Sequence, residues 1–108
     1  MSKLKIGCMV FEVHADDKIT LQKLGAIDYA KYEEPCDPMD YECGGFRHCA
    51  FATYDKDGRM DNTYLADGRY SSGYKLPSIF VANKKNRKAL ATLYGEKAVP
   101  QLPSEAGL

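Results

Sequence analysis

Residues 46–65, FRHCAFATYDKDGRMDNTYL, hold two runs of strand-forming residues with a turn between them. The runs Phe46–Tyr54 and Arg59–Leu65 contain the aromatic and β-branched residues that favour strands. The turn is Asp55-Lys56-Asp57-Gly58, and its glycine suits the positive φ that a tight hairpin requires. The stretch therefore predicts an antiparallel hairpin, around which the rest of a sheet can form.

Weaker strand signals lie on both sides of this hairpin. Leu4–Val13 is apolar on both faces in its middle, which is typical of a strand covered on two sides. Asp67-Gly68 predicts a second turn, after which Arg69–Tyr74 is expected to be the third strand of a β-meander. Ser78–Ala82 adds a short apolar piece. Together these segments predict a mostly antiparallel sheet.

The clearest helix signal follows the sheet. Asn83 is a suitable N-cap, Lys84–Tyr94 is the predicted helix, and Gly95 is its expected stop. The spacing of apolar residues gives this helix one face for the core and leaves its basic residues in water. The expected core residues of the helix are Ala89, Leu90 and Leu93.

The segment Lys18–Glu33 has two interpretations. In the first, Asp17 caps a helix that covers the whole segment. In the second, Lys18–Leu24 pairs back as a hairpin strand, with Ile19 and Leu21 on one face. We favour the helix, although Gly25 weakens it by about 1 kcal/mol relative to alanine. The following segment Glu34–Gly45 holds two prolines and two glycines and is expected to be a loop.

The length of the chain and its composition indicate one globular domain. It has 108 residues, of which 44% are apolar and 28% charged. We predict the α+β class, with an antiparallel β-meander, a C-terminal helix and one further helix over residues 1–99, and a loose tail over residues 100–108. The longest apolar stretch, Ile6–Val13, is too short to cross a bilayer and lacks a cleavage site behind it. These features predict a cytoplasmic protein with no membrane partner.

The chain has no net charge, but its charges are unevenly distributed. Residues 28–68 hold ten acidic and four basic residues, a net charge of −6. Residues 69–97 hold seven basic residues and one acidic residue, a net charge of +6. Either the two regions neutralise each other within the fold, or they form faces that orient a partner.

Tyrosines and basic residues carry the leading functional hypothesis. The chain has eight Tyr, four Phe and no Trp, and several tyrosines fall within the predicted meander. Tyr and Arg are favoured in protein interfaces, so we expect a small regulatory protein that binds a protein partner or self-associates into an oligomer. The same residue types stack on bases and neutralise phosphates, which makes nucleic-acid binding the alternative. The expected partner-binding residues are Arg59, Tyr64, Arg69, Tyr70, Tyr74, Lys84, Lys85, Arg87 and Lys88.

Three cysteines and a histidine within fourteen residues form the second alternative, a small zinc-binding module. Three thiols and an imidazole could complete a tetrahedral zinc site. The spacing C-x6-C-x5-C, with the histidine directly before the last cysteine, does not match the usual closely paired ligands. We therefore expect no metal and no cofactor. The residues of this weaker alternative are Cys36, Cys43, His48 and Cys49.

The usual catalytic and nucleotide-binding motifs do not occur in the sequence. We find no G-x-x-x-x-G-K-[ST], no G-x-G-x-x-G, no G-x-S-x-G and no H-E-x-x-H. Acidic neighbours disfavour an activated thiolate at Cys36 or Cys43. We therefore favour a non-enzymatic protein with no catalytic residues. Short cytosolic chains are often accessory factors of phages or mobile elements, an expectation that no particular residue carries.

Overall fold

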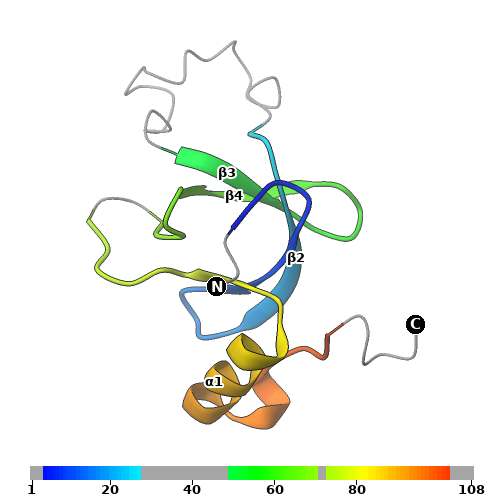
Figure 1. Cartoon of the computed structure of the whole chain (residues 1–108), viewed down its shortest axis with the longest axis vertical. Coiled ribbons are helices and arrows are strands. Elements are labelled where there is room, and N and C mark those ends of the chain that lie inside the picture. The colour runs from blue at the N-terminus through cyan, green and yellow to red at the C-terminus, as the bar shows by residue number, and fades with distance from the viewer. Residues whose placement is uncertain (1–3, 28–48, 71–72, 103–108) are drawn as a thin grey trace.

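Five strands form one antiparallel sheet, and an α-helix packs against one of its faces (Figure 1). The computed structural model describes residues 4–27, 49–70 and 73–102. The sheet is curled, and together with the helix it forms one small domain, so the predicted α+β class is confirmed. The elements of the described residues are β1 (Met9–Val13), β2 (Ile19–Gly25), β3 (Cys49–Tyr54), β4 (Met60–Leu65), β5 (Ile79–Val81), α1 (Lys84–Tyr94) and a 3-10 turn (Glu96–Ala98).

The first four strands follow one another across the sheet. The strand order is β4-β3-β2-β1-β5, and all neighbouring strands are antiparallel. Strands β1 to β4 thus form a meander, and β5 returns to the free side of β1. The central residues of β1, Val10, Phe11 and Glu12, are all buried, so the side chains on both faces of this strand are covered. The expectation of a strand covered on two sides is confirmed over Met9–Val13.

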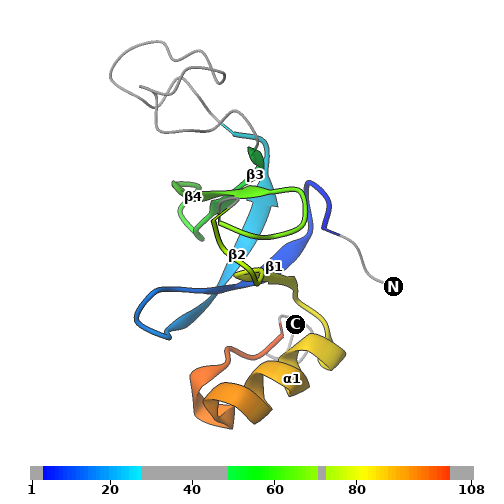
Figure 2. The same cartoon turned by 90° about the vertical axis from the view of Figure 1, so that its left-hand side faces the viewer.

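Alternation along β1 separates the two faces of the sheet. Phe11 pairs with Leu21 on β2 and with Phe80 on β5, and its side of the sheet faces α1, as Figure 2 shows. Each fully buried side chain of this size contributes roughly 1.5–3 kcal/mol to folding. The packed domain extends beyond Pro100, the first residue of the expected tail. The buried residues of this helix-side core are Phe11, Ile19, Leu90, Val99 and Leu102.

The opposite face holds a second apolar cluster and three buried polar side chains. Glu12, Gln22 and Thr53 are all buried on this face. Buried polar groups need hydrogen-bond partners, so this face requires specific hydrogen bonds that an apolar face does not. The apolar residues of this second cluster are Val10, Leu24, Tyr64 and Ile79.

Helix α1 begins and ends as the sequence predicts. The Asn83 side-chain oxygen accepts a hydrogen bond from the backbone N–H of Asn86 at 2.8 Å. Gly95 follows the helix with a φ of 98°, and its N–H donates to the carbonyl of Ala91 at 2.9 Å. A side-chain cap at the start and a glycine at the end are the signals from which the helix was predicted.

The predicted core stripe of this helix is correct only at Leu90. Leu90 is 4% exposed and lies in the helix-side core, where Ala91 packs against it. Ala89 and Leu93 were expected beside it, but both are exposed. The side of the helix that packs on the sheet instead includes Leu90 and Ala91, which leaves Ala89 and Leu93 in solvent.

The helix favoured over Lys18–Glu33 is wrong for the described part of this segment, where the chain forms β2. Asp17 caps no helix; it has a φ of 64° in the tight turn between β1 and β2. Gly25 suits the sheet because the Tyr54 ring lies 2.8 Å from where a Cβ would stand, which leaves no room for a side chain. The hairpin alternative was therefore the right interpretation, and residues 28–33 lie outside the described part.

The connection between β4 and β5 also differs from expectation. The turn at Asp67-Gly68 is confirmed, and Gly68 has a φ of 91°. The third strand predicted over Arg69–Tyr74 is wrong for the described residues of that segment, which form no strand. The hydrogen bonds of the described residues differ from those of a strand paired along β4: the backbone N–H of Leu65 donates to the carbonyl of Arg69, and the side chain of Arg69 donates to the carbonyl of Tyr74.

The sequence also predicted one further helix and a long loop. The described residues hold no second α-helix, only the 3-10 turn Glu96–Ala98. None of the helices in this part of the chain combines the length and the apolar character needed to cross a membrane. The loop predicted over Glu34–Gly45 lies outside the described residues.

Candidate functional site

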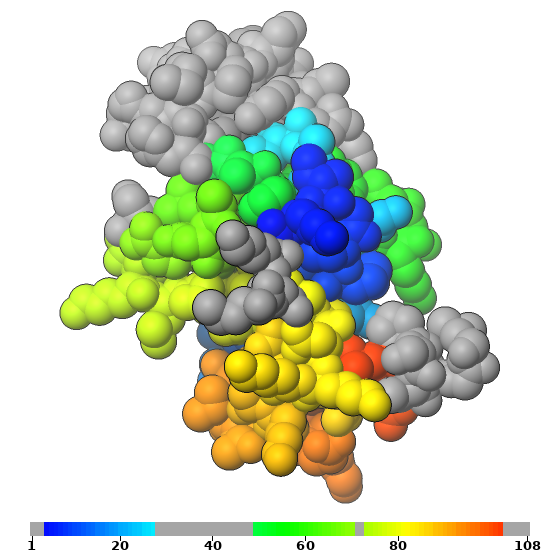
Figure 3. Space-filling view, in the orientation of Figure 1, coloured from blue at the N-terminus to red at the C-terminus, as the bar shows by residue number. Residues whose placement is uncertain are grey.

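An open groove runs between the turn that joins β1 and β2, the connection from β4 to β5, and the C-terminal end of α1. Its volume is about 1220 Å³. It opens at the left margin of Figure 3, between the yellow-green connection and the orange end of the helix. We name it the tyrosine groove, and its most exposed apolar walls are Tyr70, Tyr74, Leu76, Leu93 and Tyr94.

Large apolar side chains are concentrated in this groove. Of the six that are exposed among the described residues, five are the walls of the groove, and Ile6 is the exception. Leu76 and Leu93 are each 76% exposed. Single exposed apolar residues are ordinary on a protein surface, whereas a contiguous set is typical of a binding site. The tyrosine groove is therefore the strongest candidate for the functional site.

Three tyrosines form an edge-to-face row that leads from the core to the groove wall. The ring centroids of Tyr64 and Tyr70 lie 5.9 Å apart, and those of Tyr70 and Tyr74 lie 5.6 Å apart. The interplanar angles are 73° and 81°, close to the T-shaped geometry that aromatic pairs favour. Tyr64 is buried, while Tyr70 and Tyr74 are about half exposed. The buried ring thus supports the two exposed rings.

Arg69 holds the segment that carries Tyr74. Its Nε lies 2.7 Å from Oδ2 of Asp67, and its Nη1 donates to the backbone carbonyl of Tyr74 at 3.0 Å. The backbone N–H of Arg69, and after it the guanidinium, lowers the pKa of the Asp67 carboxyl. Arg69 was predicted to contact a partner, but its guanidinium is engaged within the chain, where it positions the groove wall.

A buried carboxylate lies directly behind the groove lining. Glu12 accepts hydrogen bonds from Oγ1 of Thr53 at 3.1 Å, from Nδ2 of Asn62 at 3.0 Å and from the hydroxyl of Tyr64. Burial raises the pKa of Glu12, and the hydrogen bonds from Tyr64 and Asn62 act against that rise. Burial and the neighbouring Glu12 raise the pKa of the Tyr64 hydroxyl above its usual range. The three donors fix the orientation of the carboxylate.

Four more polar side chains gather beside Glu12. Nε2 of His14 lies 3.9 Å from Oε1 of Glu12 and 2.7 Å from Oγ1 of Thr20. Nε2 of Gln22 donates to Oγ1 of Thr20 at 2.9 Å and to Oδ2 of Asp61 at 3.5 Å. The sheet register explains the gathering, because Thr20 on β2 pairs directly with Glu12 on β1. These five residues are named the Glu12 cluster.

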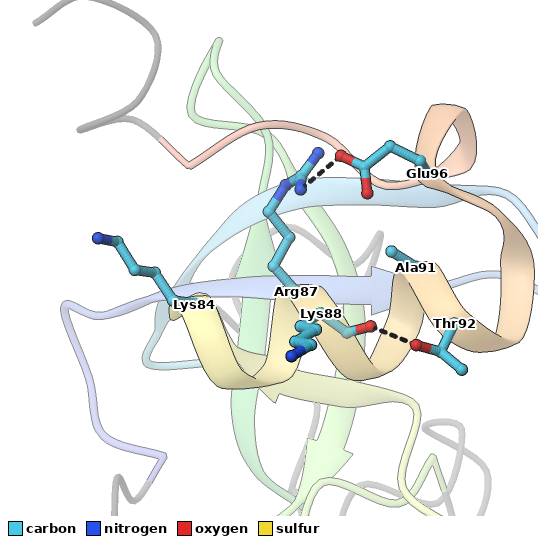
Figure 4. Close-up of a pocket in the computed structure, with 6 residues that line it drawn as sticks. All are labelled: Lys84, Arg87, Lys88, Ala91, Thr92 and Glu96. Atoms are coloured by element: carbon cyan, nitrogen blue, oxygen red, sulfur yellow. Dashed lines mark hydrogen bonds and ion pairs between the residues drawn. The ribbon is translucent and has the colours of Figure 1, made fainter.

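The basic residues of α1 lie apart from the groove. Lys84, Arg87 and Lys88 line a shallow concavity of about 410 Å³ (Figure 4), which shares no lining residue with the tyrosine groove. Nη1 of Arg87 lies 2.8 Å from a carboxylate oxygen of Glu96, and the guanidinium also donates to two backbone carbonyls beyond the 3-10 turn. Arg87 thus links the helix to the segment that follows it.

The structure brings together only some of the residues predicted to bind a partner. Tyr64, Tyr70 and Tyr74 meet in the groove, whereas Lys85 and Arg59 line neither concavity. Of the suggested zinc ligands, Cys49 is a half-buried free thiol at the start of β3. The other three, Cys36, Cys43 and His48, lie outside the described residues.

Sequence reasoning missed the residues that complete the site. Leu93 was assigned to the core, and Leu76 was not considered. His14 and Glu12 were not recognised as neighbours of Asp61, which is 49 positions from Glu12 along the chain. A signal for the cluster does exist: Glu12 is an acidic residue within the apolar strand β1, where a charge needs partners.

Comparison of the chain with protein-family models, with curated proteins and with solved structures found no significant match. The argument for function therefore rests on the geometry of the groove and of the Glu12 cluster.

Proposed function

We propose that this chain is a non-enzymatic regulatory protein of the cytosol that binds an apolar, aromatic-containing segment of a partner protein in the tyrosine groove. The observation that carries the proposal is the gathering of five of the six exposed large apolar side chains in one groove. Tyr side chains in such settings often supply most of the binding energy. The two cysteines among the described residues, Cys8 and Cys49, are free thiols, which suits a reducing compartment.

The groove walls are organised before any partner binds. The row of Tyr64, Tyr70 and Tyr74 is anchored in the core, and Arg69 ties the carbonyl of Tyr74 to the turn at Asp67. Ordering a flexible side chain on binding costs about 0.5–1.5 kcal/mol. Rings that are held in place avoid part of this cost, so the same contact area gives a higher affinity.

The size and the rim of the groove favour a polypeptide over a small molecule. Small-ligand pockets usually enclose about 300–1,000 Å³, and this groove is larger and open to solvent. An apolar centre with a polar rim is the usual anatomy of a protein interface. A standard interface of about 800 Å² per partner is close to a tenth of the 7501 Å² surface of this chain. The charged residues that line the groove are of both signs, Asp16, Asp17, Lys18 and Lys75.

The proposal is tested by affinity capture from host lysate with groove variants. The groove variant is Leu76→Ser combined with Leu93→Ser, which removes two exposed apolar side chains without touching either core. The matched control is Ile6→Ser, an exposed apolar residue outside the groove. All captures are run with nuclease, so that a partner bridged by nucleic acid is lost from every sample.

We expect a protein that the wild-type chain and Ile6→Ser capture equally and that the double variant does not capture. Capture that is unchanged in the double variant, or that nuclease abolishes, contradicts the proposal. Sedimentation of the purified chain tests whether a second copy of the same chain occupies the groove. A dimer that the double variant dissociates would assign the groove to a second copy of this chain instead of a partner protein.

A further inference from the structure

We propose that the Glu12 cluster binds a divalent transition-metal ion through His14, Glu12 and Asp61. Nε2 of His14 and one carboxylate oxygen from each of the two acids all lie within 4.8 Å of one another. The three ligands come from β1, from the residue that follows it and from β4, two strands that are brought close together although β2 and β3 lie between them in the sheet. This inference does not depend on the partner proposed for the groove.

The negative charge of the cluster favours the binding of a cation. Two carboxylates lie close together, and His14 is the only described residue that forms an ion pair with either of them. No Lys or Arg within the described ranges pairs with Glu12 or Asp61. Two acids and a neutral imidazole match the charge of a divalent ion. An imidazole nitrogen combined with carboxylate oxygens suits transition metals better than Ca²⁺ or Mg²⁺.

Hydrogen-bond donors surround Glu12 and hold its carboxylate in place, as they do around metal ligands. Thr53 donates to Oε1, while Asn62 and Tyr64 donate to Oε2. Each carboxylate oxygen has two acceptor positions, and among the described residues only Thr53 donates a hydrogen bond to Oε1, which leaves its second position open. This is the oxygen that lies 3.9 Å from Nε2 of His14. Donors that orient a ligating carboxylate are a regular feature of metal sites and contribute to their affinity.

Gln22 supplies an independent observation at the same place. Its side chain is aimed at the cluster, because Nε2 reaches both Thr20 and Asp61. Gln22 is only 6% exposed, yet its Oε1 has no hydrogen-bond partner in the described structure. A buried carbonyl oxygen without a donor is unfavourable, because no hydrogen bond compensates for its removal from water. The amide that carries this oxygen lies at the edge of the cluster, with its Nε2 3.5 Å from Oδ2 of Asp61.

To close the site, the ligand atoms have to move together, and Nε2 of His14 has to give up its hydrogen bond to Thr20. Ligand atoms around a tetrahedral ion with bonds of about 2.1 Å stand roughly 3.4 Å apart. The 3.9 Å between His14 and Glu12 therefore has to shorten by about 0.5 Å. His14 and Asp61 are both accessible to solvent, so an ion can enter beside them and leave its remaining positions to water.

The probe for this site is Mn²⁺, because thiolates bind it weakly and the cysteines of the chain then compete little. Loss of the free Mn²⁺ electron paramagnetic resonance signal measures binding to the full chain. The test variant is Asp61→Asn, which keeps the shape of an exposed side chain. The matched control is Asp57→Asn, an exposed aspartate of the same hairpin outside the cluster. Broadening of backbone amide NMR signals by bound Mn²⁺ then locates the ion.

We expect one bound Mn²⁺ per chain, with broadening centred on His14 and Thr20. Asp61→Asn is expected to lower the affinity at least about tenfold, and Asp57→Asn to leave it unchanged. Any of three results overturns the proposal: no Mn²⁺ bound, equal affinity in both variants, or broadening centred on residues 28–48. Partner capture by the tyrosine groove is measured separately, so failure here leaves the proposed function standing.

Discussion

The two faces of the sheet are buried by different means. On the helix side, Phe11 packs in a core with Leu90 and Leu102, and every buried residue is apolar. On the opposite face, Glu12 is fully buried within a network of hydrogen bonds beside the apolar cluster. Apolar burial stabilises a fold directly, whereas the hydrogen bonds of a buried carboxylate mainly offset the cost of removing it from water.

This difference suggests a division of labour. The helix-side core holds α1 and the segment up to Leu102 on the sheet. The opposite face gives up part of its stability to keep Glu12, His14 and Asp61 together beside the tyrosine groove. If so, substitutions on the two faces should differ in kind: those in the helix-side core should change the free energy of unfolding, and those around the groove should change binding.

The largest effect on stability is expected from Phe11→Ala in the helix-side core. Phe11 is fully buried, and truncating such a ring costs about 3–5 kcal/mol in the free energy of unfolding. Urea denaturation followed by circular dichroism measures this change. A cost below about 1 kcal/mol would show that the helix-side core does not hold the domain together.

A smaller effect is expected from Tyr64→Phe on the opposite face. The variant keeps the ring that packs in the second apolar cluster and removes only the hydroxyl that donates to Glu12. Losing a donor to a buried carboxylate costs about 1–3 kcal/mol. The same denaturation experiment, run with a chelator present, gives the value. A variant as stable as the wild type would mean that the network contributes nothing to folding.

The contribution of the polar face to the free energy of unfolding should depend on pH, whereas that of the apolar face should not. Burial raises the pKa of Glu12 in the folded protein. The stability that this carboxyl contributes is fully present below its unfolded pKa and is lost as the pH rises through the raised pKa. The slope for one proton is at most about 1.4 kcal/mol per pH unit. Unfolding of the metal-free chain across pH should show this loss in the wild type and not in Glu12→Gln; parallel curves would contradict it.

The smallest effect on stability is expected from Leu93→Ser in the groove wall. Leu93 is 76% exposed, so its replacement should change the free energy of unfolding by no more than about 0.5 kcal/mol. Thermal unfolding of the purified variant is sufficient to measure this. A cost of about 2 kcal/mol or more would place Leu93 in the core after all, and would remove one wall of the proposed binding surface.

Local signals in the sequence were sufficient for much of the fold. Asn83 and Gly95 predicted both ends of α1, and Gly58 predicted the turn between β3 and β4. Each of these depends on a few neighbouring residues, whose conformational preferences act whatever the rest of the chain does. The apolar run ending at Val13 likewise predicted a strand covered on both faces, because both parities of that run are apolar.

The errors arose where distant contacts decide the structure. A helix was favoured over Lys18–Glu33 despite Gly25, because the strand pairing that packs the ring of Tyr54 over this glycine cannot be read from the local sequence. Arg69 was expected in a strand, yet its side chain donates a hydrogen bond to the carbonyl of Tyr74, five positions along the chain. The Glu12 cluster needs the register of β1, β2 and β4, and a single sequence does not contain that register.

The central claim is that a partner protein lies in the tyrosine groove, and site-specific photo-crosslinking tests it most directly. The photoreactive residue p-benzoylphenylalanine replaces Tyr74 in the groove wall, or Lys85 on the exposed side of α1 as the control. Both positions are solvent-exposed, and the aromatic probe preserves a ring at Tyr74. After irradiation in host lysate, we predict one crosslinked partner protein from the Tyr74 position and none from Lys85. A partner that crosslinks equally from both positions, or from Lys85 alone, would contradict the account.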